Sequence, residues 1–234
     1  MIGTIINVIA VLVGGTLGTV FGNRLPQRNQ ETVIKGLGLF TFAIGIQMFL
    51  NTENVIIALG SLLLGAMVGE WWRIETGLEK IGQWLQDRFM PKEGDDKFFI
   101  QGFLTASLVF CVGPMTILGA IQDGLSGDYS LLALKSVLDG FAAMAFASSL
   151  GVGVIFSALV VLIYQGGLSL LAVQIQDFVT PAMMDEMTAV GGVIMLGLSI
   201  SSLLEIKKIR TANFLPALFI APLLVFLLSI FGWL

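Results

Sequence analysis

Two ionisable residues, Lys135 and Asp139, lie four positions apart inside an apolar run of the sequence. Positions four apart share one face of an α-helix, so the two side chains can form an internal ion pair. If the run spans a membrane, Asp139 lies about 12 Å deep, near the centre of an apolar layer about 30 Å thick. Charged groups at this depth are costly and often bind or carry an ion or solute. The alternative is a structural pair that fixes helix packing.

The preceding apolar run is interrupted by Gly113 and Pro114. Proline has no backbone N–H, so a carbonyl of the previous turn is left free to line a path for a cation or polar solute. An ordinary kink is the alternative. Asp123 is a candidate for an outer vestibule, whereas Asp128 is better interpreted as part of a solvated turn. With the polar residues of the neighbouring runs, the candidate path residues are Asp139, Lys135, Asp123, Pro114, Gly113, Thr116, Gln101 and Gln165.

The composition favours a membrane protein and argues against an enzyme. Of the 234 residues, 56% are hydrophobic and only 12% are charged, with a mean hydropathy of +0.93. The chain has no histidine and one cysteine, Cys111, so the commonest general base and a cysteine metal cluster are both missing. We therefore expect no catalytic residue, no metal site and no cofactor. The net charge of −4 makes nucleic acid an unsuitable partner.

Hydropathy predicts eight membrane segments, at residues 2–22, 34–50, 54–72, 98–121, 131–149, 152–173, 189–205 and 212–233. The fifth and sixth are almost continuous, and one helix of that length would be about twice as long as a bilayer is thick. We therefore expect a turn at residues 148–151. This fold class is an all-helical membrane protein with about eight spans, in a single domain covering residues 1–234.

The positive charges of the loops test this count. Twelve Lys and Arg residues are present, and all except Lys135 fall on one side of the membrane if the chain crosses it eight times. These are Arg24, Arg28, Lys35, Arg73, Lys80, Arg88, Lys92, Lys97, Lys207, Lys208 and Arg210. Positive loops face the cytoplasm, so both termini are predicted outside it, in the inner (plasma) membrane. With seven spans, the last cluster would face the wrong side.

Residues 74–90 differ from the apolar segments. Ile74, Leu78, Ile81, Leu85 and Phe89 recur at helical spacing, and the opposite face is charged. This pattern predicts an amphipathic helix, which either lies on the cytoplasmic membrane surface or packs on the protein's own loops. A short polar linker, residues 91–97, follows it.

The two ends of the chain resemble each other weakly. Gly14-Gly15 matches Gly166-Gly167, and Ile44-Gly45-Ile46 matches Leu196-Gly197-Leu198 at the same offset. Further matches relate Thr52, Asn54, Ala58 and Leu59 to Thr211, Asn213, Ala217 and Leu218. Because five spans precede the second copy, residues 1–72 and 152–234 would form an inverted three-helix repeat, a feature of many secondary transporters. Shared helix composition is the alternative. Residues 98–149 lie between the copies.

Small residues form two stripes at four-residue spacing, Gly14, Gly18 and Gly22, and Ser61, Gly65 and Gly69. Such stripes let helices approach closely. We favour packing within the chain over dimerisation, and a homo-oligomer remains an alternative.

The stretches Phe99 to Asp128, Leu134 to Phe141 and Tyr164 to Gly166 resemble domain-of-unknown-function family 554, bacterial membrane proteins of the YqgA/YdfK type. The resemblance covers essentially the whole chain. It implies a polytopic inner-membrane protein, linked loosely to biofilm behaviour and often presumed to be a transporter. It supplies no catalytic residue.

These observations favour a transporter of a small solute or ion, in which Asp139 and Lys135 bind or couple and the broken fourth segment lines the path. The partners expected are the lipid bilayer and an unknown small solute or ion. The alternative function is a membrane scaffold or signalling partner that acts through residues 74–90.

Overall fold

The computed structural model describes residues 1–22, 26–89, 96–175 and 179–231, and within them the chain forms helices joined by turns, with no strand. Contacts divide the chain into two compact units. The first combines Met1–Leu37 with Leu78–Asp177, and the second combines Gly38–Gly77 with Phe178–Leu234. Arg24, Lys92 and most of the predicted linker 91–97 lie outside the described residues.

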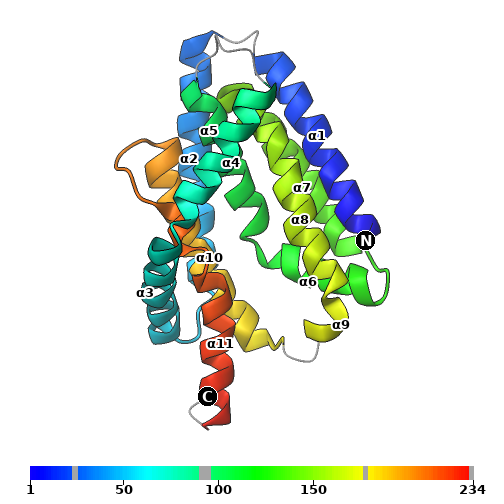
Figure 1. Ribbon diagram of the computed structural model, residues 1–234, viewed down its shortest axis with the longest axis vertical. Coiled ribbons are helices and arrows are strands. Elements are labelled where there is room, and N and C mark those ends of the chain that lie inside the picture. The colour runs from blue at the N-terminus through cyan, green and yellow to red at the C-terminus, as the bar shows by residue number, and fades with distance from the viewer. Residues whose placement is uncertain (23–25, 90–95, 176–178, 232–234) are drawn as a thin grey trace. The chain divides into compact units, whose positions relative to one another are not determined.

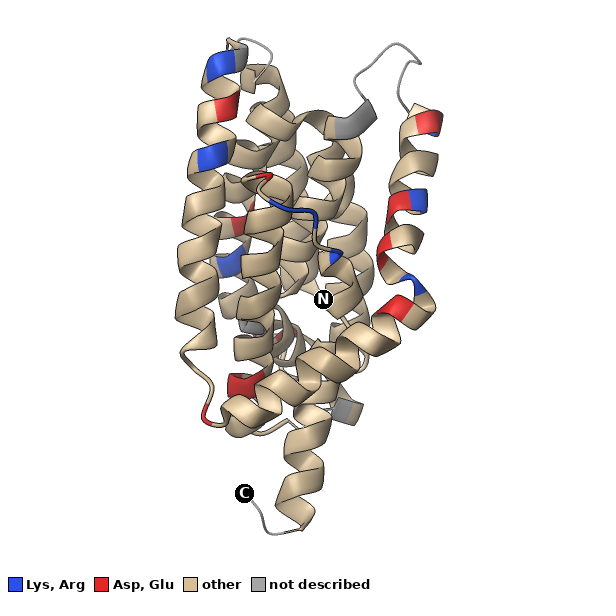
Figure 2. Cartoon of the chain, turned by 90° about the vertical axis from the view of Figure 1, so that its left-hand side faces the viewer, with Lys and Arg blue, Asp and Glu red and all other residues tan. Residues whose placement is uncertain are grey.

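Long apolar helices dominate both units. Six described helices are long and apolar enough to cross a membrane, or seven if a bent helix pair counts as one span. Figure 2 shows long stretches of helix without a charged residue. The described part of the chain therefore has the helical, membrane-spanning character that its composition predicts.

Most helices of the first unit come from its second stretch of chain, Leu78–Asp177 (Figure 1). Its helices are α1 (Ile2–Gly22), most of α4 (Ile74–Phe89), α5 (Asp96–Cys111), α6 (Pro114–Leu125), α7 (Ser130–Leu150), the 3₁₀ turn η1 (Gly151–Phe156), α8 (Ser157–Leu170) and α9 (Ala172–Ile175). The first part of α2 (Gln27–Phe49) also belongs to it.

The chain reverses direction between α7 and α8. Gly151, where the reversal begins, has a φ of 76°, a conformation that glycine adopts easily. Asn7 of α1 donates from one nitrogen, Nδ2, to Asp139 on α7 and to Gln165 on α8, over 2.9 Å in each case. Along one straight helix these two acceptors would be about 39 Å apart. The turn predicted at residues 148–151 is therefore present.

Glycines bring α1 into close contact with α7. A Cβ atom added to Gly14, Gly18 or Gly22 would lie 2.1 to 2.3 Å from a backbone oxygen of α7, at Gly140, Met144 and Ser148 respectively. The contacts advance together along both helices, so α1 and α7 run parallel. This stripe of small residues thus packs inside the chain, as the sequence favoured.

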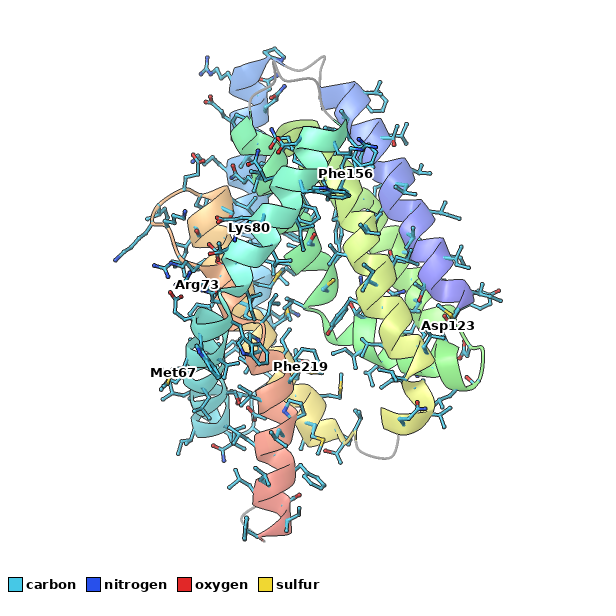
Figure 3. All side chains as sticks on the ribbon, viewed as in Figure 1. Met67, Arg73, Lys80, Asp123, Phe156 and Phe219 are labelled. Carbon is cyan, nitrogen blue, oxygen red and sulfur yellow. The ribbon has the colours of Figure 1, made fainter. Side chains whose placement is uncertain are left out.

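The amphipathic helix α4 packs on α5 within the first unit. Leu85 is buried with Phe99 and Phe103, and a Cβ at Gly82 would contact Phe103. Phe156 of η1 closes this cluster, and its ring centroid lies 5.5 Å from that of Phe89 (Figure 3). One face of α4 therefore rests on the protein itself, whereas Ile81 and Trp84 are exposed.

The second unit contains the remaining helices: the second part of α2, α3 (Val55–Trp72), α10 (Pro181–Leu198), the π-helical turn η2 (Ser199–Leu203), the 3₁₀ turn η3 (Thr211–Phe214) and α11 (Ala217–Ile230). The second small-residue stripe lies in α3. A Cβ atom added to Gly65 would meet Ala217, and one added to Gly69 would lie 1.9 Å from the backbone oxygen of Asn213. Ile57, Met183 and Val225 form an apolar core beside this contact.

Candidate functional site

Lys135 and Asp139 form a buried ion pair on α7. Nζ of Lys135 donates to Oδ2 of Asp139, and the two side chains are only 6% and 11% exposed. Both residues lie on the face of α7 that is turned into the first unit, as their burial shows. The spacing of four residues on one helix had predicted this pairing.

Three polar side chains extend the pair onto two further helices. Asn7 donates to Asp139 and to Gln165, and Nε2 of Gln165 donates to Thr4 over 3.2 Å. Thr4, Asn7 and Gln165 are fully buried. The five residues form one hydrogen-bonded chain across α7, α1 and α8, which we call the polar cluster.

One strong acceptor of the polar cluster is unused. Oδ1 of Asn7 is buried and has no hydrogen-bond partner among the described residues. The orientation of the amide is fixed by its surroundings, because both neighbours of Nδ2 are oxygen acceptors and require the nitrogen to face them. This oxygen is therefore able to accept from a further donor or to bind a cation.

The predicted break in the fourth apolar segment separates α5 from α6, whose axes differ by 62°. Pro114 is the first residue of α6, and Gly113 precedes it in an extended conformation. The hydroxyl of Thr116 donates to the carbonyl of Phe110 over 3.1 Å. This is the carbonyl that an amide at position 114 would normally bind, so Thr116 satisfies the acceptor that the proline leaves free.

Asp123, near the end of α6, lies beside the start of α1 (Figure 3). Its side chain is fully buried. Oδ2 accepts the backbone N–H of Gly3 over 3.1 Å, and Oδ1 lies 2.9 Å from the amino group of Met1. A carboxylate at a helix N-terminus compensates the unpaired N–H groups there, so these contacts give Asp123 a structural role.

Asp128, which follows in the loop, behaves as the solvated turn that the sequence favoured. Its Oδ1 accepts from the amide and the hydroxyl of Ser130 at the start of α7, and these hydrogen bonds lower the pKa of this exposed carboxyl. Gln101 is half-buried near the start of α5 and lies well before the break.

A cavity of about 400 Å³ lies at the ends of α1 and α7. It is lined by the ends of these two helices, by the beginning of α2 and by Phe98 of α5. Gln30 reaches across from α2 and donates to the carbonyl of Gly22, the last residue of α1. The cavity therefore joins three stretches of chain that are distant in the sequence.

Sequence reasoning missed the residues that become polar partners only in the folded chain. Asn7 and Thr4 look like isolated polar residues in an apolar helix, and their partners lie more than 120 residues away. Glu186 of α10 was also missed. It is buried and accepts hydrogen bonds from the Thr52 hydroxyl and from the backbone amides of Glu53 and Asn54, over 2.8 to 3.0 Å.

The polar cluster combines charged and neutral polar groups. Within the described residues, no group of three or more His, Cys, Asp or Glu side chains is placed to hold a metal ion. The cluster instead offers one carboxylate, one ammonium group, two amides and a hydroxyl. Such groups can bind a small polar solute or a cation in an apolar surrounding.

Apolar helices around a buried ion pair define an integral membrane protein of helical type. The chain belongs to the family described as "Protein of unknown function (DUF554)", whose model matches residues 2–226. It is 31% identical to the uncharacterized membrane protein YdfK of Bacillus subtilis, over 99% of both chains. It is 36% identical to the uncharacterized protein YqgA of Escherichia coli, over 94% of both chains. No solved structure matches it.

Proposed function

We propose that this protein transports a small solute or an ion across the bacterial inner membrane, and that Asp139 and Lys135 bind what is carried. The observation that carries the proposal is the buried ion pair with its partners on α1 and α8. One ionised side chain at the centre of a membrane helix costs about 3 kcal/mol on insertion scales. Helix packing alone can be achieved with small apolar residues, as the contact between α1 and α7 illustrates.

The helix break supports a path beside this pair. Transporters commonly bind their substrate where a membrane helix is interrupted near the midplane. The bend between α5 and α6 follows Cys111, and both helices pack against α7, which carries the ion pair. The proposal therefore places the substrate between the break and the ion pair, inside the first unit.

Eight spans and an inverted repeat are part of the proposal. Counting the two arms of the α7–α8 reversal separately, and the α5–α6 pair as one span, gives eight. In an inverted repeat, corresponding helices enter the membrane from opposite faces. Each corresponding pair does pack antiparallel: α1 with α8, the second part of α2 with α10, and α3 with α11.

The two Thr-x-Asn turns provide further support within the second unit. The turn at Thr52 and Asn54 is bound by Glu186 from the other proposed copy. The turn at Thr211 and Asn213 is bound by Glu70 of the first copy, to which Asn213 donates, and by Glu75 at the start of α4, which accepts from the amide of Ala212. Each turn is thus bound by one carboxylate of the opposite copy, Glu186 or Glu70.

The cavity at the ends of α1 and α7 supports the proposed orientation. Eight spans place the end of α1, the turn after α7 and the start of α5 all on the cytoplasmic side, and these segments meet at this cavity. Both termini would then face away from the cytoplasm.

Flux measurements test the transport function. The protein is reconstituted into liposomes and assayed with a panel of ions and small solutes, and Asp139→Asn is compared with wild type. Asp128→Asn is the matched control, because Asn keeps the oxygen that accepts from Ser130 in this exposed loop. We expect flux that Asp139→Asn reduces at least about tenfold and Asp128→Asn leaves unchanged. Flux that is absent for every solute, or that is equal in Asp139→Asn and Asp128→Asn, would contradict the transport model.

The second candidate is a membrane scaffold or signalling partner, which the exposed Ile81 and Trp84 on α4 favour. Deleting residues 74–90 would also remove the packing of Leu85 on α5, so substitution is the cleaner test. The double change Ile81→Ser with Trp84→Ser should leave flux intact if the protein is a transporter. It should abolish the cellular effect if α4 binds a partner.

A further inference from the structure

We propose that the polar cluster is a binding site for a monovalent alkali cation, and that the ammonium group of Lys135 fills this site in the present structure. The inference rests on the proposed transport function and names the class of ion that its site would take. Its evidence is the Asp139 carboxylate, which binds the ammonium group of Lys135, and the unpartnered oxygen of Asn7 beside that carboxylate.

Two oxygens of the cluster are close enough to bind one ion. Nδ2 of Asn7 lies 2.9 Å from Oδ2 of Asp139. Oδ1 of the same amide is about 2.3 Å from Nδ2 by covalent geometry, so it lies within roughly 5 Å of that carboxylate oxygen. A cation bound to both oxygens at about 2.4 Å each, as in calcium sites, spans a similar separation.

The oxygen of Asn7 is available to a further ligand. This atom is buried in a fully buried residue and has no hydrogen-bond partner in the described chain. An amide oxygen left in this state is costly unless something binds it. The carboxylate, amide and hydroxyl oxygens nearby are hard ligands, which prefer alkali and alkaline-earth ions to soft metals.

The charge balance selects a monovalent ion. With Lys135 in place, the ion pair is neutral. If the lysine side chain withdraws, the cluster carries one negative charge, which one monovalent cation neutralises. A divalent ion would leave a net positive charge among buried apolar residues, and such a charge is costly there.

Lys135 then acts as a tethered cation. It is attached four residues before Asp139 on the same helix and reaches it through a flexible stem. The lysine and a free cation would compete for one carboxylate, so the site alternates between a lysine-filled and an ion-filled state. Either state satisfies Asp139, whereas removal of both cations would leave a buried charge without a partner.

Substitution of Lys135 tests this competition directly. Lys135→Met keeps an apolar stem but removes the tethered charge. Its unfolding midpoint is measured in detergent with Li⁺, Na⁺ or K⁺ chloride, and with N-methyl-D-glucamine chloride at equal ionic strength. We expect at least one alkali ion to raise the midpoint by about 3 °C or more, with saturation. Wild type should need an ion concentration at least about tenfold higher.

Two further variants locate the effect. The double variant Lys135→Met with Asp139→Asn should lose the response completely, and Lys135→Met with Asn7→Leu should weaken it. Equal midpoints of Lys135→Met in all four salts, or a response that survives without the Asp139 carboxylate, would overturn the inference.

A second route covers the possibility that Lys135→Met does not fold. Asn7→Asp retains the lysine but adds one negative charge, so it should also become sensitive to alkali ions. Absence of that response would reject the cation site. Asp139-dependent flux of a solute without any cation response would reject the cation and leave transport standing. Loss of all flux with a retained cation response would reject transport and leave a static ion site.

Discussion

At the scale of single residues, the described buried carboxylates each meet a specific positive or N–H partner. Asp139 meets Lys135 and Asn7, Asp123 meets the start of α1, and Glu186 meets the turn before α3. The last two contacts satisfy backbone N–H groups that have no partner at the beginning of a helix. Of these three, only Asp139, paired with Lys135, lies in the middle of a helix, where no backbone N–H group requires a partner. This is why the function is proposed at that pair.

Thr116 gives a prediction at this scale. Thr116→Val keeps the shape of the side chain but removes the hydroxyl that binds the Phe110 carbonyl. Both residues are buried, so the carbonyl loses its partner, and we expect a loss of about 2 kcal/mol in the free energy of unfolding. Denaturant or thermal unfolding in detergent measures this loss.

Thr16→Val is the matched control for this change. The hydroxyl of Thr16 donates to the Leu12 carbonyl on an exposed part of α1, and that carbonyl also accepts the regular helix amide. This control should therefore change stability very little. Equal losses in the two variants would contradict the role assigned to Thr116.

The ion pair could be predicted from sequence because both partners lie on one helix, four residues apart. Asn7 could not, because the link from Asn7 to Asp139 spans 132 residues and the one to Gln165 spans 158. A lone asparagine in an apolar helix gives no indication of which distant side chain it meets. The contacts of Asp123 could not be predicted for the same reason, since its partners lie at the start of α1.

At the scale of the elements, hydropathy predicted the bounds of α1, α3 and α7 to within one or two residues. It placed the starts of α2 and α10 seven or eight residues too late. Both helices begin with polar turns, which contain Arg28 and Glu31 in α2 and Asp185 and Glu186 in α10. A hydropathy scan detects the apolar span, whereas the helix continues through any residues whose backbone hydrogen bonds can be satisfied.

The contact between α1 and α7 gives a prediction at this scale. In Gly14→Ala, the new Cβ would lie 2.1 Å from the Gly140 oxygen, so the two helices must separate. We expect a loss of at least about 2 kcal/mol in the free energy of unfolding, although alanine is the better helix former. Thermal unfolding in detergent is the measurement.

Gly167→Ala in α8 is the control, because a Cβ there meets nothing within 4 Å. This variant should be as stable as wild type or slightly more stable, since alanine favours the helix by about 1 kcal/mol over glycine. A stable Gly14→Ala variant would show that α1 and α7 are not in this close contact.

At the scale of the whole molecule, the number of spans decides whether an inverted repeat can exist. If residues from Ser130 to Leu170 crossed the membrane only once, the corresponding segments would enter from the same face. The reversal at Gly151, fixed by the contacts of Asn7, places α8 antiparallel to α1. In the proposed eight-span topology, this reversal leaves an odd number of spans before the second copy and puts the last cluster of positive charges in the cytoplasm.

Accessibility of single cysteines tests this topology. Cys111 is the one cysteine of the sequence, so Cys111→Ser gives a background without thiols. In that background, Asp128→Cys should react with a membrane-impermeant maleimide in intact cells whose outer membrane is permeable to the reagent. Lys208→Cys is exposed on the chain and should react only after the inner membrane is opened, because eight spans place it in the cytoplasm. Labelling of both positions in intact cells would mean seven spans, and the opposed copies on which the transport proposal draws would then point the same way.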